Sequence, residues 1–232
     1  MVKKIVALGA IVVFVLSLCG NIITKQRQPL EIPMADCEND VNHEVVEVEL
    51  VAKSTISPYD PIFKVVCEEH GNDWRFMSAM AYHESRFKPD VTSHQGAQGM
   101  MQIMPNTAKF FNVEKEELSD VETNIMVANL LVNRIDKMLK LPASTPEDDR
   151  MGMILASYNG GIGYVLNARM LARKNGENAN SWSVVSSYLV KMKDADFAAS
   201  NNVKHFKGVG QTIAYVDNVI GHYNHYCQLA ML

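Results

Sequence analysis

The stretch from Ala81 to Ala108 changes character three times within 28 residues. An apolar helical pattern that carries one glutamate gives way to a polar segment with two glycines. A methionine-rich run follows and stops at Pro105. Glycine lets a backbone approach a ligand closely, so an acid delivered by a helix to a glycine-bearing loop is typical of an active site. The stretch therefore predicts a helix end that carries catalytic chemistry.

Glu84 is the acid of this stretch, and it falls on the apolar side of the predicted helix. The stripe, at spacings of three and four, comprises Trp74, Met77, Met80, Ala81 and Glu84. Burial disfavours the charged carboxylate, which should raise the pKa of Glu84 into the range useful for a general acid at neutral pH. The structural alternative is a glutamate at a frayed helix end, paired with Arg86 or Lys88.

The segment after the helix combines small polar residues with thioethers and an amide. Ser93, Gly96 and Gly99 supply the loop, and Gly99 to Pro105 brings Gln102 and several methionines back past the helix end. Apolar side chains suit the faces of a sugar ring, while an amide suits its hydroxyl and acetamido groups. This composition favours a carbohydrate ligand, although methionine also serves as ordinary core filler.

The order of these motifs resembles the catalytic signature of the family 1 lytic transglycosylases, within the goose-lysozyme-like superfamily. ESRFKP from Glu84 and SHQGAQGMMQIMPNTA from Ser93 follow the family pattern without a gap, with Met100 where leucine is usual. ASYNGGIG from Ala156 is similar to A-Y-N-A-G-x-G. QTIAYV from Gln211 is similar to E-T-x-x-Y-V, with glutamine in place of the glutamate that supports that motif. The upstream run from YDPIF at Tyr59 through DWR at Asp73 looks most like the membrane-bound F-type branch, and the whole resemblance covers about residues 57 to 226.

The resemblance implies a mainly α, lysozyme-like (goose-type) domain that acts on peptidoglycan glycan strands. It implies that Glu84 acts first as acid and then as base, giving 1,6-anhydro-MurNAc ends without water, and it implies no metal or other cofactor. The substrate-binding residues carried over are Ser93, Gln102, Met104, Tyr158, Asn159 and Tyr215, with Tyr215 also expected to hydrogen-bond Glu84. A hydrolytic muramidase or chitinase, and a peptidoglycan-binding protein without turnover, are the alternatives.

The N-terminus has the pattern of an export signal. Lys3 and Lys4 precede an uncharged apolar run from Ile5 to Ile23. The sequence LSLCG around Cys19 is close to a bacterial lipoprotein signal, with Leu18 where a small residue is usual. Lipidation of Cys19, an uncleaved membrane span and ordinary signal cleavage all place the remaining chain outside the cytoplasm. We expect an outer-membrane lipoprotein on the periplasmic side of the bacterial envelope.

Three regions are predicted from composition. Residues 1–19 form the signal or anchor, residues 20–56 form an acidic tether with seven acids against three bases, and residues 57–232 form the catalytic domain. Helices are expected at 59–70, 74–87, 104–111, 122–139, 147–158, 161–174, 182–192 and 211–227, with residues 194–210 as a polar connector.

Other classes of site and partner are disfavoured by the sequence. Scattered basic residues and a net charge of −4 argue against nucleic acid. His222 and His225 have ligand-like spacing but no third ligand nearby in the sequence, so no metal site is predicted. Cys67 and Cys227 allow a disulfide in an oxidising envelope, whereas Cys67 on an apolar face is also compatible with simple burial. The protein is expected to act as a monomer.

Overall fold

The computed structural model describes residues 55–229 of this chain. The signal segment, Cys19 and nearly all of the predicted tether lie outside the described residues. The described part belongs to one compact unit.

Helices make up nearly all of the regular structure in residues 55–229, which confirms the mainly α class. The longer helices are α2 (Asp60–His70), α3 (Trp74–Ser85), α5 (Val121–Leu139), α6 (Glu147–Ala156), α7 (Ile162–Lys174), α8 (Trp182–Lys191) and α10 (Val209–Leu229). The short ones are α4 (Pro105–Phe110), α9 (Ala195–Ser200), a 3₁₀ helix η1 (Lys115–Ser119) and a π-helical turn η2 (Ser157–Gly161).

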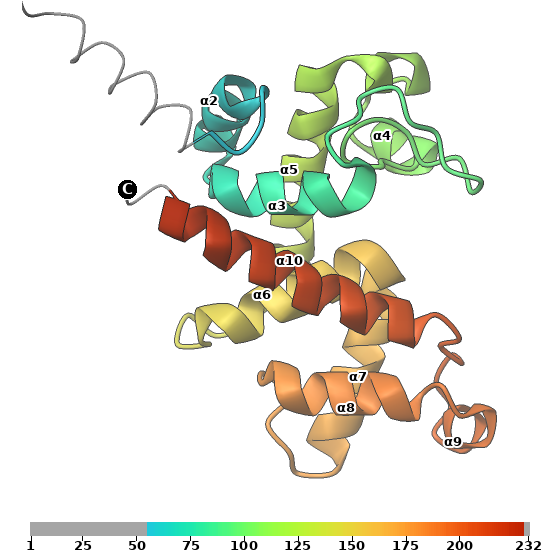
Figure 1. Cartoon of the computed structure of the whole chain (residues 1–232). Helices are drawn as coiled ribbons and strands as arrows, with labels where there is room; N and C mark the ends of the chain where they lie inside the picture. Colours follow the sequence, from blue (N-terminus) through green and yellow to red (C-terminus); the bar gives the residue numbers. More distant parts are fainter. Residues whose placement is uncertain (1–54, 230–232) are drawn as a thin grey trace, which may run out of the picture. The chain divides into compact units, whose positions relative to one another are not determined.

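α3 is the helix against which much of this unit packs. Met77, Met80 and Ala81 are completely buried on it, as the apolar stripe predicted. α10 packs along α3 and also crosses α6, while α2 packs against both α3 and α5 (Figure 1). The acid-bearing helix is therefore held from several sides, which fixes the position of its C-terminal end.

α3 ends at Ser85, two residues earlier than predicted. Arg86 and Phe87 both adopt left-handed backbone conformations, with φ of 57° and 59°, so the helix stops before Pro89 forces it to. The Arg86 guanidinium lies 4.0 Å from the centroid of the Tyr82 ring one turn back. This stacking offsets part of the cost of a left-handed arginine.

The segment 194–210 also differs from the prediction of a polar connector, because it contains α9. The Asp194 side chain caps this helix by accepting a hydrogen bond from the Phe197 amide at 2.7 Å, and Ala198 is buried. α9 is only six residues long, too short for a periodic apolar pattern to reveal it.

Two further expectations concern the membrane and the cysteines. Within residues 55–229, no helix is long and apolar enough to cross a membrane. Cys67 and Cys227 are free thiols rather than a disulfide, and Cys67 is completely buried. Burial of Cys67 raises the pKa of its thiol to about 12, so this cysteine is protonated and packs as a small apolar side chain.

Candidate active site

Glu84 lies in the last turn of α3, where the buried stripe reaches the end of the helix. Its side chain is only partly accessible to solvent. Burial raises the pKa of its carboxyl from 4.5 to about 7, and the nearby Tyr215 hydroxyl opposes part of that rise. The pKa shift expected from the apolar stripe is therefore confirmed. At neutral pH a substantial fraction of Glu84 carries a proton that it can donate.

Two tyrosines from distant parts of the sequence lie near this carboxyl. Tyr158 comes from η2 and Tyr215 from α10, and the negative charge of Glu84 helps burial to raise the pKa of both phenols well above 10. Both hydroxyls therefore remain protonated. The fold brings together three of the residues that the sequence singled out, from segments more than 50 residues apart.

Tyr215 interacts with Glu84 more loosely than expected. The Tyr215 side chain is buried, and its hydroxyl influences the pKa of Glu84. Within residues 55–229, however, this hydroxyl makes no hydrogen bond of standard geometry. We therefore treat it as a nearby dipole rather than as a fixed partner of the carboxyl. A buried phenol without a close partner leaves a donor at the site for an incoming acceptor.

The π-helical turn η2 connects Tyr158 to the loop that faces it. The Tyr158 hydroxyl donates a hydrogen bond to the Met101 carbonyl at 2.7 Å. The next residue, Asn159, is exposed, and its Oδ1 accepts a hydrogen bond from the Thr212 hydroxyl of α10 at 2.8 Å. A π-turn inside a helix commonly marks a functional site, because the extra residue redirects side chains.

The loop between α3 and α4 is held by its own polar side chains. The Ser93 hydroxyl accepts from the Ala97 amide at 3.0 Å. The Gln102 amide donates to the Val91 and Gly99 carbonyls at 3.1 and 3.0 Å. Met104, at the start of α4, is 40% exposed. Ser93 and Gln102 thus shape the loop directly, and Met104 offers an accessible thioether.

Asn124 was missed by the sequence analysis, although it anchors this loop to α5. It is 1% exposed, its Nδ2 donates to the carbonyls of Gln98 and Leu118 at 3.1 and 3.0 Å, and its Oδ1 accepts from the Met101 amide at 2.7 Å. An asparagine on the buried face of a predicted helix was the available signal.

Gly99 lets the loop pack closely against Asn124 and Leu118, and it does not leave space for a ligand. Its φ is +76°, and a Cβ there would lie 2.1 Å from the Asn124 amide nitrogen and 2.6 Å from the Leu118 carbonyl oxygen. Gly96, by contrast, has open space around it. The expectation that Gly99 leaves room for a ligand is therefore wrong, because α5 fills that room.

A pair of histidines beside Glu84 was also missed. His83 Nε2 lies 2.9 Å from His222 Nδ1, and the His83 ring is 6.4 Å from the Tyr215 ring, centroid to centroid. Burial, followed by the charges of His222 and Arg86, lowers the pKa of His83.

Within residues 55–229, no group of three or more His, Cys, Asp or Glu side chains is arranged to hold a metal ion.

Comparison with a family model places residues 62–181 in the "Transglycosylase SLT domain" family. Membrane-bound lytic murein transglycosylase F of Aeromonas hydrophila is 32% identical over 174 residues, which cover 74% of this chain and 33% of that protein. The protein of the same name from Yersinia enterocolitica is 32% identical over 168 residues, covering 72% of this chain and 34% of that protein. The chain thus spans about a third of the length of the curated relatives it matches.

Comparison with solved structures supports the same fold. An inactive mutant of lytic transglycosylase Slt from Pseudomonas aeruginosa superposes with a TM-score of 0.52 at 18% identity, over 74% of this chain and 24% of that one. At this identity the similarity concerns the fold alone. It agrees with the lysozyme-like helical architecture predicted from the motifs.

Proposed function

The chain belongs to the transglycosylase SLT domain family, and on that basis we propose that it is a peptidoglycan lytic transglycosylase. The proposed reaction cleaves the β-1,4 bond between MurNAc and GlcNAc and leaves a 1,6-anhydro-MurNAc end. The observation that carries the proposal is the partly accessible Glu84, whose carboxyl has a pKa of about 7 and lies near two protonated phenols.

The proposed mechanism uses one carboxyl twice. Protonated Glu84 first gives its proton to the bridging oxygen, so the bond from that oxygen to the anomeric carbon breaks. The Glu84 carboxylate then takes the proton from the 6-hydroxyl of the MurNAc residue that carries this anomeric carbon. The 6-oxygen bonds to the anomeric carbon. Glu84 ends protonated as it began, and no water is consumed. An intramolecular hydroxyl is an effective nucleophile because it is already positioned.

A single acid is what distinguishes this reaction from hydrolysis. Glycoside hydrolases normally use a second carboxyl, either as a nucleophile or as the base that activates water. The loop that follows α3 has no Asp or Glu between Asp90 and Glu114. The pKa of Glu84 is set by burial, which raises it, and by the Tyr215 hydroxyl, which lowers it, rather than by a second carboxyl. These features favour the lyase over the muramidase.

Six further residues are proposed to bind the glycan. Tyr158 and Tyr215 offer ring faces and phenol hydroxyls near Glu84, and the exposed Asn159 offers its amide. Met104 supplies accessible apolar surface for a sugar face. Ser93 and Gln102 are proposed to contact the acetamido groups of the glycan while keeping the loop hydrogen bonds described above.

The proposed location is the periplasmic side of the bacterial envelope. An anchor at Cys19, followed by the acidic segment 20–56, would let the domain reach glycan strands at a distance from the membrane. The partners proposed are the glycan strands and, through the N-terminal anchor, a membrane. The domain is proposed to work as a monomer.

The test of this function is release of soluble fragments from dye-labelled murein by the full-length chain. Glu84→Gln keeps the size of the side chain but cannot exchange a proton, so we expect a rate loss of about a hundredfold or more. Glu68→Gln removes the same charge from an exposed position on α2 and serves as the matched control. Borohydride should not reduce the released ends.

Each other result points to a specific alternative. Full activity in Glu84→Gln would remove Glu84 from the mechanism. Reducible ends from the wild-type protein would indicate a muramidase. Binding to murein without any release by the wild-type protein would indicate a glycan-binding protein.

A further inference from the structure

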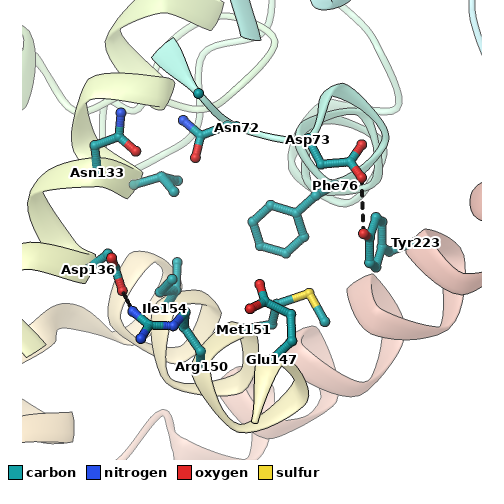
Figure 2. Close-up of a pocket in the computed structure, with 12 residues that line it drawn as sticks. Asn72, Asp73, Phe76, Asn133, Asp136, Glu147, Arg150, Met151, Ile154 and Tyr223 are labelled. Carbon is teal, nitrogen blue, oxygen red and sulfur yellow. Dashed lines mark hydrogen bonds and ion pairs between the residues drawn. The ribbon is translucent and has the colours of Figure 1, made fainter. Parts of the chain in front are cut away.

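A cavity lies at the opposite end of α3 from Glu84. Its volume is about 220 Å³, and Figure 2 shows its lining. The residues Asn72, Asp73 and Phe76 at the start of α3 form one side, and α5, α6 and α10 supply the others. Asp73 and Glu84 are separated by about 16 Å of helix at 1.5 Å per residue. This cavity is therefore distinct from the candidate active site.

Two paired carboxylates stand on opposite walls of this cavity. Asp73 pairs with Arg75 at 2.7 Å and accepts a hydrogen bond from the Tyr223 hydroxyl at 3.0 Å. Across the space, Asp136 of α5 pairs with Arg150 of α6 (Figure 2). Tyr223 holds Asp73 from α10 and Arg150 holds Asp136 from α6, so the positions of both carboxylates are fixed before any ligand arrives.

The hydrogen-bond donors on the wall are directed at the protein itself. Asn72 Nδ2 donates to Asn129 Oδ1, and Asn133 Nδ2 donates to the His70 carbonyl, both at 2.9 Å. Arg150 donates to the Pro142 carbonyl at 3.1 Å as well as to Asp136. The side-chain oxygens of Asn72 and Asn133 accept no hydrogen bond from residues 55–229. The cavity thus presents acceptors, which select a ligand that donates.

The charge of the wall also selects a cation. The wall itself carries three acids, Asp73, Asp136 and Glu147, and one base, Arg150. Arg75 lies outside the lining and pairs with Asp73, so these five groups together leave one net negative charge. Glu147, at the start of α6, is the uncompensated acid, since it has no ion-pair partner among residues 55–229. Its carboxylate lies between the two paired walls in Figure 2. A ligand that brings a positive charge would therefore meet its counter-ion there.

The remaining lining is apolar. Phe76, Val132, Met151 and Ile154 line the cavity and are each less than 8% exposed, so the wall between the carboxylates includes a hydrophobic surface. A compact cavity of this kind suits a short aliphatic chain with one polar end.

We propose that this cavity is a binding site for a primary ammonium group on a short aliphatic chain, as in the side chain of lysine or another diamino acid. The ammonium group donates to Glu147 and the aliphatic chain contacts Phe76 and Met151, while the free oxygens of Asn72 and Asn133 accept from a second donor of the ligand. The site goes beyond the proposed function and does not depend on it.

The test is isothermal titration calorimetry of the full-length chain with pentane-1,5-diamine as the probe. Pentan-1-ol has the same chain without the charge and is the comparison ligand. We expect saturable binding of the diamine, weakened about tenfold or more in Glu147→Gln, because the acceptor of the ammonium group loses its negative charge. Asp148→Asn makes the same change of charge at the neighbouring exposed position and should leave the affinity within about twofold of wild type.

Three results would overturn the proposal. The first is the absence of saturable binding of the diamine to the wild-type chain. The second is equal binding of the diamine and pentan-1-ol, which would make the cavity merely apolar. The third is equal weakening by Glu147→Gln and Asp148→Asn, which would reduce the effect to the general charge of the surface. All three readouts are independent of murein cleavage.

Discussion

The pKa of about 7 at Glu84 determines the pH range over which the proposed acid holds its proton. A general acid must be protonated when substrate binds, so kcat/KM should fall above about pH 7, by about tenfold for each further pH unit. Dye release from murein, measured across this range, checks the prediction. A profile that stays flat to about pH 9 would show that another group donates the proton.

Tyr215 influences the dependence of kcat/KM on pH. Its hydroxyl lowers the pKa of Glu84, so Tyr215→Phe should move the alkaline fall in kcat/KM to higher pH, by up to about one pH unit. Tyr188→Phe is the matched control, since it removes the hydroxyl that Tyr188 of α8 donates to Glu177 at 2.6 Å. A merely structural role for Tyr215 predicts a lower rate with the alkaline limb unchanged.

The same carboxyl has a consequence for stability. The folded protein holds the Glu84 proton with a pKa of about 7, whereas the unfolded chain releases it near 4.5. The folded state therefore loses stability as pH rises between these values, and the loss is complete above pH 7. Glu84→Gln removes the ionisation. Its free energy of unfolding in urea should match that of wild type near pH 4 and exceed it at pH 8, by at most roughly 3 kcal/mol.

Glu68→Gln is again the control for that measurement, because this exposed side chain should leave stability nearly unchanged at both pH values. If Glu84→Gln were less stable than wild type at pH 8, the carboxylate would be making favourable contacts in the folded state. Burial would then not be the main influence on its pKa.

At the scale of elements, periodicity predicted α3 and its buried face but not where the helix ends. The stripe of Met77, Met80 and Ala81 is a local pattern, and its burial is confirmed. The end at Ser85 depends on the left-handed Arg86, whose guanidinium stacks on Tyr82. Such a side-chain contact has no signature in an apolar pattern, so the predicted helix ran two residues too far.

Asn124 joins α5 to the loop between α3 and α4, and this junction can be tested. Asn124→Ala leaves two carbonyls and the Met101 amide without their buried partner, so we expect a loss of about 2 to 4 kcal/mol in the free energy of unfolding. The rate should also fall, because the Met101 carbonyl positions Tyr158. Chemical denaturation and dye release measure the two effects.

Asn224→Ala, at an exposed position of α10, is the matched control for that variant and should change stability by less than about 0.5 kcal/mol. Wild-type stability in Asn124→Ala would mean that water replaces the asparagine in holding the loop.

At the scale of the whole described unit, the site depends on contacts that motif order alone does not specify. Glu84, Tyr158 and Tyr215 belong to three motifs that are recognisable in the sequence. Their proximity arises because α10 packs on both α3 and α6, the helix that leads into η2. The histidine pair of His83 and His222 arises from the same packing, and 139 positions separate its members. Sequence spacing gave no reason to join them.

The cavity at the start of α3 illustrates the same limit. Its residues come from the connection between α2 and α3 and from the helices α3, α5, α6 and α10, and no sequence pattern groups Asp73 with Asp136 or Glu147. The motifs predict chemistry at one end of α3, whereas only the packed structure reveals the acceptors at the other end.

The measurement that tests the central claim most directly is mass spectrometry of muropeptides released from purified murein in water enriched in the heavy oxygen isotope. If the 6-hydroxyl of the sugar is the nucleophile, the new ends are lighter than hydrolysed ends by one water and carry no heavy oxygen. Glu84→Gln should release none of these fragments. Heavy oxygen at the new ends would show that water attacks the anomeric carbon, and it would contradict the assignment of this protein as a lytic transglycosylase.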